Sequence, residues 1–317
     1  YDLILEPKPT QPYSEKEKYV LDQYLMNGGK MLWLAEVTNM ETDSLFNDRG
    51  TAIALPRNLN LGDYFFSYGL RINPEIVNDL YSAPIVLASG DGNNTRFNPY
   101  PWFYSPLTSS PSEHPIINNI EAVKFEYANP IDTLANGIKK TILLSSSPKT
   151  KLEGVPEEIS LNMVGEKPDL SSYNTGEQPL SVLLEGKFKS VYKNRVKPFS
   201  IENHKDESIE TKMLVISDGD VIKNDVQGGT PMELGFQRYT GNTYGNKEFL
   251  LNAVNYLLDD TGLIDIRSKE IELAFLDKEK VAQEREKWQV INLVGPLLIL
   301  LIFGIIFRLY RKHKYVK

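Results

Sequence analysis

Three aspartates lie within eight residues of the segment "LVISDGDVIKND", directly after an apolar run from Met213 to Ile216. Asp218 and Asp220 follow the end of a predicted strand, and ligands of open α/β sheets bind beyond the C-terminal ends of strands. Together with the Asn224 side chain, their carboxylates could hold a hard cation such as Mg²⁺ or Ca²⁺ through oxygen ligands. Asp218, Asp220 and Asn224 are therefore candidate ligand or partner residues.

A tight turn is the competing interpretation of the same segment. Asp-Gly-Asp suits a turn because Asp hydrogen-bonds to nearby backbone and Gly permits a positive φ. The spacing differs from the calcium loop Asp-x-Asp-x-Asp-Gly, and the closing Glu of that loop is missing. We favour the turn, keep ligand contact and a catalytic metal as alternatives, and assign no metal ligands.

A second candidate is the aromatic segment "NPYPWFYSPL", which contains Trp102 and Tyr104. Exposed aromatic rings of this kind stack on sugars or anchor a partner protein. Four aromatic side chains in one short loop are costly to leave in water, so packing against a sheet edge is the favoured alternative. Trp102 and Tyr104 remain candidates for ligand or partner contact.

Several classes of chemistry lack the residues that they need. The chain has no cysteine and only three histidines, which leaves thiol nucleophiles, disulfides and the usual zinc sites without ligands. The segment "SGDGNN" lacks the Gly-Lys-Ser/Thr end of a nucleotide loop, and no Gly-x-Ser-x-Gly elbow occurs. A formal net charge of −7 argues against general nucleic-acid binding. We predict a protein that is not an enzyme, with no catalytic residues and no cofactor.

The opening segment predicts a strand, a helix and a second strand. Tyr1 to Leu5 and Lys30 to Ala35 are apolar, strand-like runs. Between them Ser14 is a predicted N-cap, and Glu17 three residues later completes a capping box. A helix between two buried strands indicates a right-handed parallel crossover.

The same alternation continues along the chain. Strands are predicted at "APIVLAS", "KKTILLSSS", "PLSVLLEGKF" and "TKMLVISDGD", a short helical turn at "LRINPEIVNDL" and a helix at "NKEFLLNAVNYLLDD". Strands that are apolar on both faces indicate a sheet covered by helices on both sides. The predicted fold class is α/β, with an open, mostly parallel sheet and helices on both faces.

The C-terminal region predicts a membrane anchor, with a buried core helix as the alternative. Residues 290–307 form an uncharged, mostly apolar stretch that is long enough for a transmembrane helix. The basic residues that follow it are typical of a cytoplasmic end. We expect an extracytoplasmic domain over 1–268, a charged helical stalk over 269–288, a transmembrane helix over 289–308 and a cytoplasmic tail over 309–317. Because Tyr1 already lies in a strand-like run, we expect the sequence to be a fragment of a longer protein.

A set of motifs in a fixed order carries a family resemblance. They are "PYSEKEKYVLDQYLMNGGKMLWL", "PWFYSPL" followed by "HPI", "LLEGKFKSVYKNR", "VISDGDVIKND", "YGNKEFLLNAVNYLLDD" and "IRSKEIELAFLDKEKV". The chain resembles the ABC-transporter auxiliary domain of the GldG type, associated with gliding motility in Bacteroidetes-type bacteria. The resemblance implies a class I glutamine-amidotransferase-like fold without the catalytic cysteine, and an ABC permease and ATPase as partners.

From these observations we predict a non-catalytic, membrane-anchored auxiliary or substrate-binding component of an ABC transporter associated with gliding motility. It would lie in the inner membrane with most of the chain in the periplasm, in contact with permease and ATPase subunits. An envelope solute or glycan is a candidate ligand, and no contact with nucleic acid is expected. One alternative is a cell-envelope glycan-binding module that uses Trp102. The other is a membrane-tethered hydrolase that uses Asp218 and Asp220 with a divalent cation.

Overall fold

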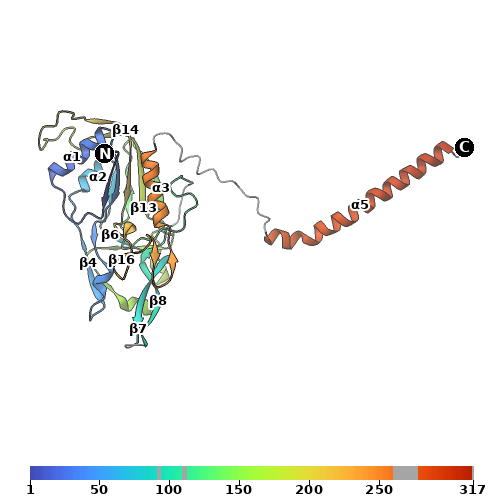
Figure 1. Ribbon diagram of the computed structural model, residues 1–317, viewed down its shortest axis with the longest axis horizontal. Helices are drawn as coiled ribbons and strands as arrows, with labels where there is room; N and C mark the ends of the chain where they lie inside the picture. The colour runs from blue at the N-terminus through green and yellow to red at the C-terminus, as the bar shows by residue number, and fades with distance from the viewer. Residues whose placement is uncertain (91–93, 109–112, 260–277, 316–317) are drawn as a thin grey trace. The chain divides into compact units, whose positions relative to one another are not determined.

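The computed structural model describes residues 1–90, 94–108, 113–259 and 278–315. These residues belong to two compact units, Tyr1–Ser268 and Lys269–Lys317 (Figure 1). Residues 269–277 of the stalk expected over 269–288 lie outside the described residues. From Lys278 to Tyr315 the chain is helical.

A five-stranded mixed sheet forms the centre of the first unit, in the order β1-β2-β14-β13-β10. Its strands are β1 (Leu3–Pro7), β2 (Lys30–Leu34), β10 (Lys139–Ser145), β13 (Pro179–Lys189) and β14 (Glu207–Ile216). β2 pairs in parallel with both β1 and β14, whereas β13 runs antiparallel to both β14 and β10. The C-terminal ends of β1, β2 and β14 therefore lie side by side at one edge of the sheet.

Helix α1 (Glu15–Met26) makes the predicted crossover between β1 and β2. The capping box is confirmed: the Ser14 hydroxyl accepts from the Glu17 backbone N–H, and the Glu17 carboxylate accepts from the Ser14 backbone N–H. The buried Asp22 of α1 accepts hydrogen bonds from the Tyr68 hydroxyl, just after helix α2 (Gly62–Ser67), and from the Val191 N–H. These bonds satisfy a carboxylate that would otherwise be costly to bury.

Alternate residues of β2 enter two separate hydrophobic cores. Met31 and Trp33 pack with α1 and α2 on one face of the sheet, whereas Leu32 and Leu34 pack with helix α3 (Asn246–Leu258) on the other. Successive side chains of a strand point to opposite faces, so a central strand with apolar residues throughout is covered on both sides.

The other strands form small antiparallel sheets. The two longest pair β7 (Ser82–Ser89) with β8 (Arg96–Pro106), and β6 (Glu75–Asp79) with β11 (Thr150–Gly154). The remainder are β3 (Thr38–Asn39), β4 (Thr51–Pro56) and β12 (Glu157–Ser160); β5 (Leu70–Ile72) and β9 (Ile131–Thr133); β15 (Val226–Gln227) and β16 (Thr230–Pro231); and β17 (Phe236–Gln237) and β18 (Asn242–Thr243). A third core cluster, which includes Trp102, lies among them.

The predicted fold class is wrong. The described structure is mostly β, with 27% helix and 34% strand, and it has no open parallel α/β sheet of the glutamine-amidotransferase-like kind. An apolar run predicts that a strand is buried but gives no direction. β13 and β14 follow one another without an intervening helix, so they return antiparallel.

The helical turn predicted at "LRINPEIVNDL" is also wrong, because this segment forms the strands β5 and β6. Pro74 interrupts the segment, and β-branched residues follow it at Ile76 and Val77. Such residues favour strands, and the short apolar pattern does not distinguish the two structures.

The second unit contains helix α5 (Lys278–Tyr315). Its segment Lys287–Lys314 has a mean hydropathy of 2.8 over its most apolar window, none of which is buried, so it is long and apolar enough to cross a membrane. The helix continues through Pro296. Prolines are tolerated in membrane-spanning helices, where neighbouring groups compensate the lost backbone bond.

Candidate functional site

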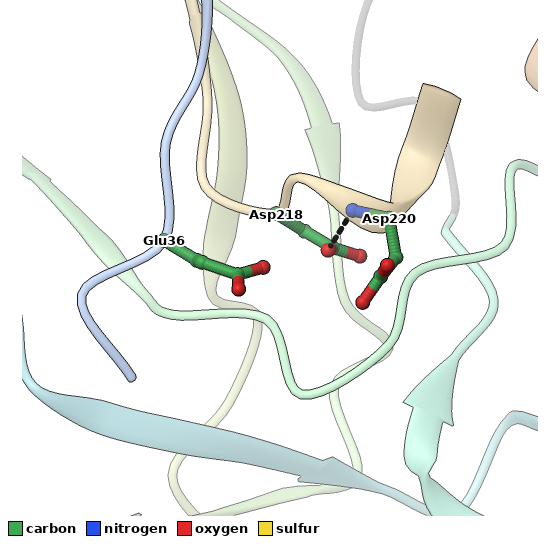
Figure 2. A group of neighbouring side chains, drawn as sticks. All are labelled: Glu36, Asp218 and Asp220. Atoms are coloured by element: carbon green, nitrogen blue, oxygen red, sulfur yellow. Dashed lines mark hydrogen bonds between the residues drawn. The ribbon is translucent and has the colours of Figure 1, made fainter. Parts of the chain in front are cut away.

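Three carboxylates converge where the parallel strands end. Glu36 lies two residues beyond β2, and Asp218 and Asp220 follow β14, its parallel neighbour. One oxygen of each residue lies within 4.8 Å of the others, and all three side chains are buried. Figure 2 shows the carboxylate groups facing one another, with the Asp220 backbone N–H donating to Asp218. Sequence reasoning placed the two aspartates at this edge but missed Glu36.

Cationic side chains already occupy the space beside these carboxylates. The Lys8 Nζ, which follows the end of β1, lies 2.7 Å from Asp220 Oδ1 and 2.6 Å from Glu41 Oε1. It also lies 3.6 Å from Glu36 Oε1. The Arg57 guanidinium donates to the same Glu36 oxygen from a side chain that is 8% exposed. Oxygen ligands that could hold a metal are thus engaged by the protein's own cations.

The glycine between the aspartates has a steric role. A Cβ at Gly219 would lie 2.3 Å from Lys8 Cγ and 2.5 Å from Lys8 Cβ, distances that real Cβ atoms do not tolerate. The φ of Gly219 is −79°, so the positive φ expected from the Asp-Gly-Asp pattern is not its reason. Lys8 itself has a φ of 47°, in the left-handed region. Gly219 therefore allows the Lys8 side chain to lie across the turn.

Asp218 fastens the turn to a neighbouring segment. Its carboxylate accepts from the Glu126 backbone N–H at 2.6 Å and from the Asp220 backbone N–H at 2.7 Å. Asp218 is fully buried, and this burial raises the pKa of its carboxyl well above the ordinary value, with further increases from Asp220 and Glu36. The two backbone bonds act in the opposite direction but do not offset the burial.

The other groups of the cluster titrate in a consistent way. Burial raises the pKa of Glu36 and of Asp220. Burial alone would lower the pKa of Lys8, but the Glu36 and Asp220 carboxylates outweigh it and raise the pKa. The Glu36 and Asp220 carboxylates therefore favour the charged form of Lys8.

A groove opens on one side of this cluster, with a cavity volume of about 830 Å³. Asp220, Asn224 and Trp102 all line it, so the fold brings these three sequence candidates to one cavity. Asn224 is exposed, and its amide donates to the Met232 carbonyl at 2.8 Å. The groove also contains exposed Lys223, whose Nζ lies 3.4 Å from Asp220 Oδ1.

The aromatic candidates lie mostly inside the protein. Trp102 is 1% exposed and Tyr104 is 4% exposed, and both belong to the third core cluster. Their rings meet edge to face with centroids 5.4 Å apart, and the Tyr104 hydroxyl donates to Glu153 Oε2 at 2.5 Å. Tyr104 does not line the groove that contains Trp102.

Two of the residues that sequence reasoning missed, Lys8 and Glu36, had a recognisable signal. Lys8 and Glu36 each follow a strand of the predicted parallel crossover, as Asp218 follows the third strand. Polar residues after adjacent parallel strands meet at one sheet edge. Arg57 and Glu41 come from segments around β4 and β3, and their approach to this edge had no signal in the sequence.

Comparison with known proteins decides the family. Residues 1–253 match the model of a family described as "ABC-type uncharacterized transport system", the ABC-transport auxiliary family. The chain belongs to this family. The family name associates it with an ABC transport system, and its specific partners are a separate question.

Two further similarities accompany this match. The chain is 23% identical to an uncharacterized protein of Borreliella burgdorferi over 303 residues, which cover 93% of this chain and 53% of that protein. The chain thus spans about half the length of this curated relative. Among solved structures, the mmIFT52 N-terminal domain matches 82% of this chain and 78% of its own at 10% identity and a TM-score of 0.37, which carries no argument about fold.

Proposed function

We propose that this chain is a non-catalytic, membrane-anchored auxiliary component of an ABC transporter, of the GldG type associated with gliding motility. The first unit would lie on the periplasmic side of the inner membrane and α5 would span it. Family membership supports the transport role. The apolar segment Lys287–Lys314, none of whose most apolar window is buried, supports the anchor. Its basic C-terminal residues support a cytoplasmic end.

The non-catalytic part of the proposal rests on one observation: the polar groups at the strand ends already have partners, Glu36 and Asp220 in ion pairs with Lys8 or Arg57 and Asp218 in two backbone hydrogen bonds. A metal-dependent hydrolase would need Asp218 and Asp220 to bind the ion in place of their present partners. Each of these aspartates instead makes hydrogen bonds or ion pairs that join separate segments of the fold. We therefore assign the cluster a structural role.

The burial of Trp102 bears on the glycan-binding alternative. A sugar stacks on an open aromatic face, and a side chain that is 1% exposed offers little of that face. This observation argues against a glycan site built on Trp102.

Purification of the full-length, tagged protein from its own membrane in a mild detergent tests the transporter assignment. A permease and an ATPase should accompany it in stoichiometric amounts, and an unrelated tagged protein with one membrane span should recover neither. A protein that emerges without them would contradict the proposal.

The absence of cysteine allows a direct test of orientation. In the full chain, Lys167→Cys places a thiol at an exposed site of the first unit, and Lys312→Cys places one near the end of α5. A membrane-impermeant maleimide applied to spheroplasts should label the first variant at once and the second only after lysis. The reverse pattern would contradict the orientation.

A further inference from the structure

The groove beside Asp220 runs along β7 and also touches Phe97, Trp102 and Ser105 of β8. Five successive residues of β7, from Pro84 to Ala88, line it. Successive side chains of a strand alternate between faces, so a cavity that touches five in a row must run along the backbone. β7 pairs only with β8, which leaves its other edge without a neighbouring strand among the described residues. Figure 1 shows this hairpin at the end of the unit opposite α1.

The pairing register tells which backbone groups point into the groove. Pro84 and Val86 of β7 stand opposite Pro101 and Pro99 of β8, which have no N–H to donate. The mutually hydrogen-bonded pairs must then be the alternate ones, and the N–H of Val86 points away from β8. The Pro84 carbonyl supports this phase, because it accepts from the Gln237 side-chain amide on the groove side at 3.1 Å. The same alternation turns the Ala88 N–H and C=O outward.

These outward groups have no partner in the described part of the chain. No backbone bond of Val86 or Ala88 is found outside the β7–β8 pair, and Ala88 is exposed. The outer edge of β8, by contrast, carries Pro99 and Pro101, which cannot pair with an added strand. An unpaired edge is a template for another extended chain, and natural proteins block such edges where pairing is unwanted. Here one edge of the hairpin is blocked and the other is open.

The other residues of the groove include charged and aromatic side chains that could contact an added strand. Residues 235–239 and Val226 line the groove across from β7. Four acidic and three basic side chains contribute. Among the described residues no ion pair of Asp43 or Asp225 is found, and the Asp225 carboxylate accepts from the Arg238 backbone N–H at 3.4 Å. The rings of Phe97 and Tyr239 stack with centroids 4.7 Å apart beside Ala88. An extended segment with a basic side chain matches both the backbone and the unpaired charges.

We propose that the β7 edge binds an extended polypeptide segment of a partner protein by β-strand addition, with a basic side chain of that segment facing Asp43 or Asp225. The Val86 and Ala88 backbone groups supply the affinity, and the groove walls select the side chains. This inference is independent of the transporter assignment, because it needs only the open edge and the groove. A glycan or a second copy of the chain are the other possible occupants.

The test uses the full chain in detergent and a display library of random dodecapeptides. Selection on the native chain is followed by counter-selection on Val86→Pro, which removes the outward N–H and places a ring at the edge. Val86→Thr is the matched control, since it changes the side chain and keeps the N–H. The enriched peptides should bind Val86→Thr as they bind the native chain, and should bind Val86→Pro at least about tenfold more weakly.

Further measurements keep the test decisive. If Val86→Pro lowers the unfolding temperature strongly, Ala88→Pro with Ala88→Ser as its control repeats the comparison at the exposed end of the strand. Bound peptide should slow amide exchange at Val86 and Ala88. The double variant Asp43→Asn with Asp225→Asn should bind basic peptides several-fold more weakly than the native chain.

Three results would overturn the proposal. The first is that the peptides bind Val86→Pro and Ala88→Pro as tightly as they bind the native chain. The second is that the selection enriches no peptide. A concentration-dependent dimer that Val86→Pro abolishes would show that the occupant is a second copy.

Discussion

The carboxylate cluster at the ends of β2 and β14 reaches the same groove as the free edge of β7, through Asp220, but the two regions differ in how their polar groups are satisfied. At the cluster, Asp218 accepts two backbone N–H groups and Asp220 is paired with Lys8. At the edge, Val86 and Ala88 have no backbone partner outside the hairpin within the described part of the chain. Charged residues are conspicuous in a sequence, yet a group already bonded within the fold has little left to offer a ligand. Unpaired backbone is inconspicuous but available.

The largest expected effect comes from removing the cation of the cluster. Lys8→Ala leaves Asp220 and Glu36 buried without their ammonium partner, and we expect a loss of about 2 to 4 kcal/mol in unfolding free energy. Lys223→Ala is the matched control, because Lys223 contacts the same Asp220 oxygen from an exposed side chain at 3.4 Å and should cost less than about 1 kcal/mol. Urea unfolding of the full chain in detergent measures both. Equal losses of unfolding free energy in the two variants would show that Lys8 stabilises the carboxylates no more than the exposed Lys223 does.

A smaller effect is expected at the glycine of the turn. Gly219→Ala forces a Cβ against Lys8 and should cost about 1 to 3 kcal/mol through displacement of that side chain. Gly62→Ala is the control, since nothing lies within 4 Å of its added Cβ and it opens helix α2. That change should be neutral or slightly stabilising. If the Gly219→Ala protein were as stable as the native one, the close approach of Lys8 to the turn would not require glycine at position 219.

The pH dependence of stability sharpens the same contrast. The folded-state pKa of Asp218 is raised, so its contribution to stability is complete below its unfolded-state pKa and is lost as pH rises through the folded-state value. Glu36 and Asp220 shift in the same direction, whereas Glu41 and Glu126 have lowered pKa values and act oppositely.

Comparison with Asp218→Asn isolates the contribution of Asp218. Over the pH range above the unfolded-state pKa of Asp, about 4, the native chain should lose stability relative to Asp218→Asn, by up to about 1.4 kcal/mol for each pH unit over which one proton is released. Thermal unfolding across this range measures the difference. A difference that stays constant with pH would mean that Asp218 has an unshifted pKa.

The smallest expected effect is that of divalent cations on the native chain. Lys8 and Arg57 engage the oxygens that such an ion would need, so EDTA, Mg²⁺ and Ca²⁺ should change the unfolding temperature by less than about 1 °C. Differential scanning fluorimetry is sufficient. A stabilisation of several degrees by one of the ions would reopen the metal interpretation.

Local structure was more predictable from the sequence than the arrangement of the strands. The capping box at Ser14, the crossover from β1 to β2 and the helix at 246–258 follow from short-range patterns and are found. The prediction of a mostly parallel sheet was wrong, because an apolar run indicates a buried strand but not the direction in which that strand runs. The aromatic segment was informative about burial but not about which core its rings would enter.

The candidate site was partly predictable for the same reason. Asp218 and Asp220 stand at the end of a strand, a position that the sequence reveals. Glu41, which pairs with Lys8, and Arg57, which pairs with Glu36, come from segments next to β3 and β4 whose placement depends on long-range packing. The open edge of β7 was invisible to the sequence, because it depends on the register against Pro99 and Pro101.

Residue-resolved amide exchange on the full chain, without any added peptide, tests the contrast between the closed cluster and the open edge most directly. The amides of Asp220 and Glu126, both bonded to the buried Asp218 carboxylate, should exchange slowly. The amides of Val86 and Ala88 should exchange fast, while those of Leu87 and Ser89, which face β8, should be slower. Slow exchange at Val86 and Ala88, or fast exchange at Asp220, would contradict the account.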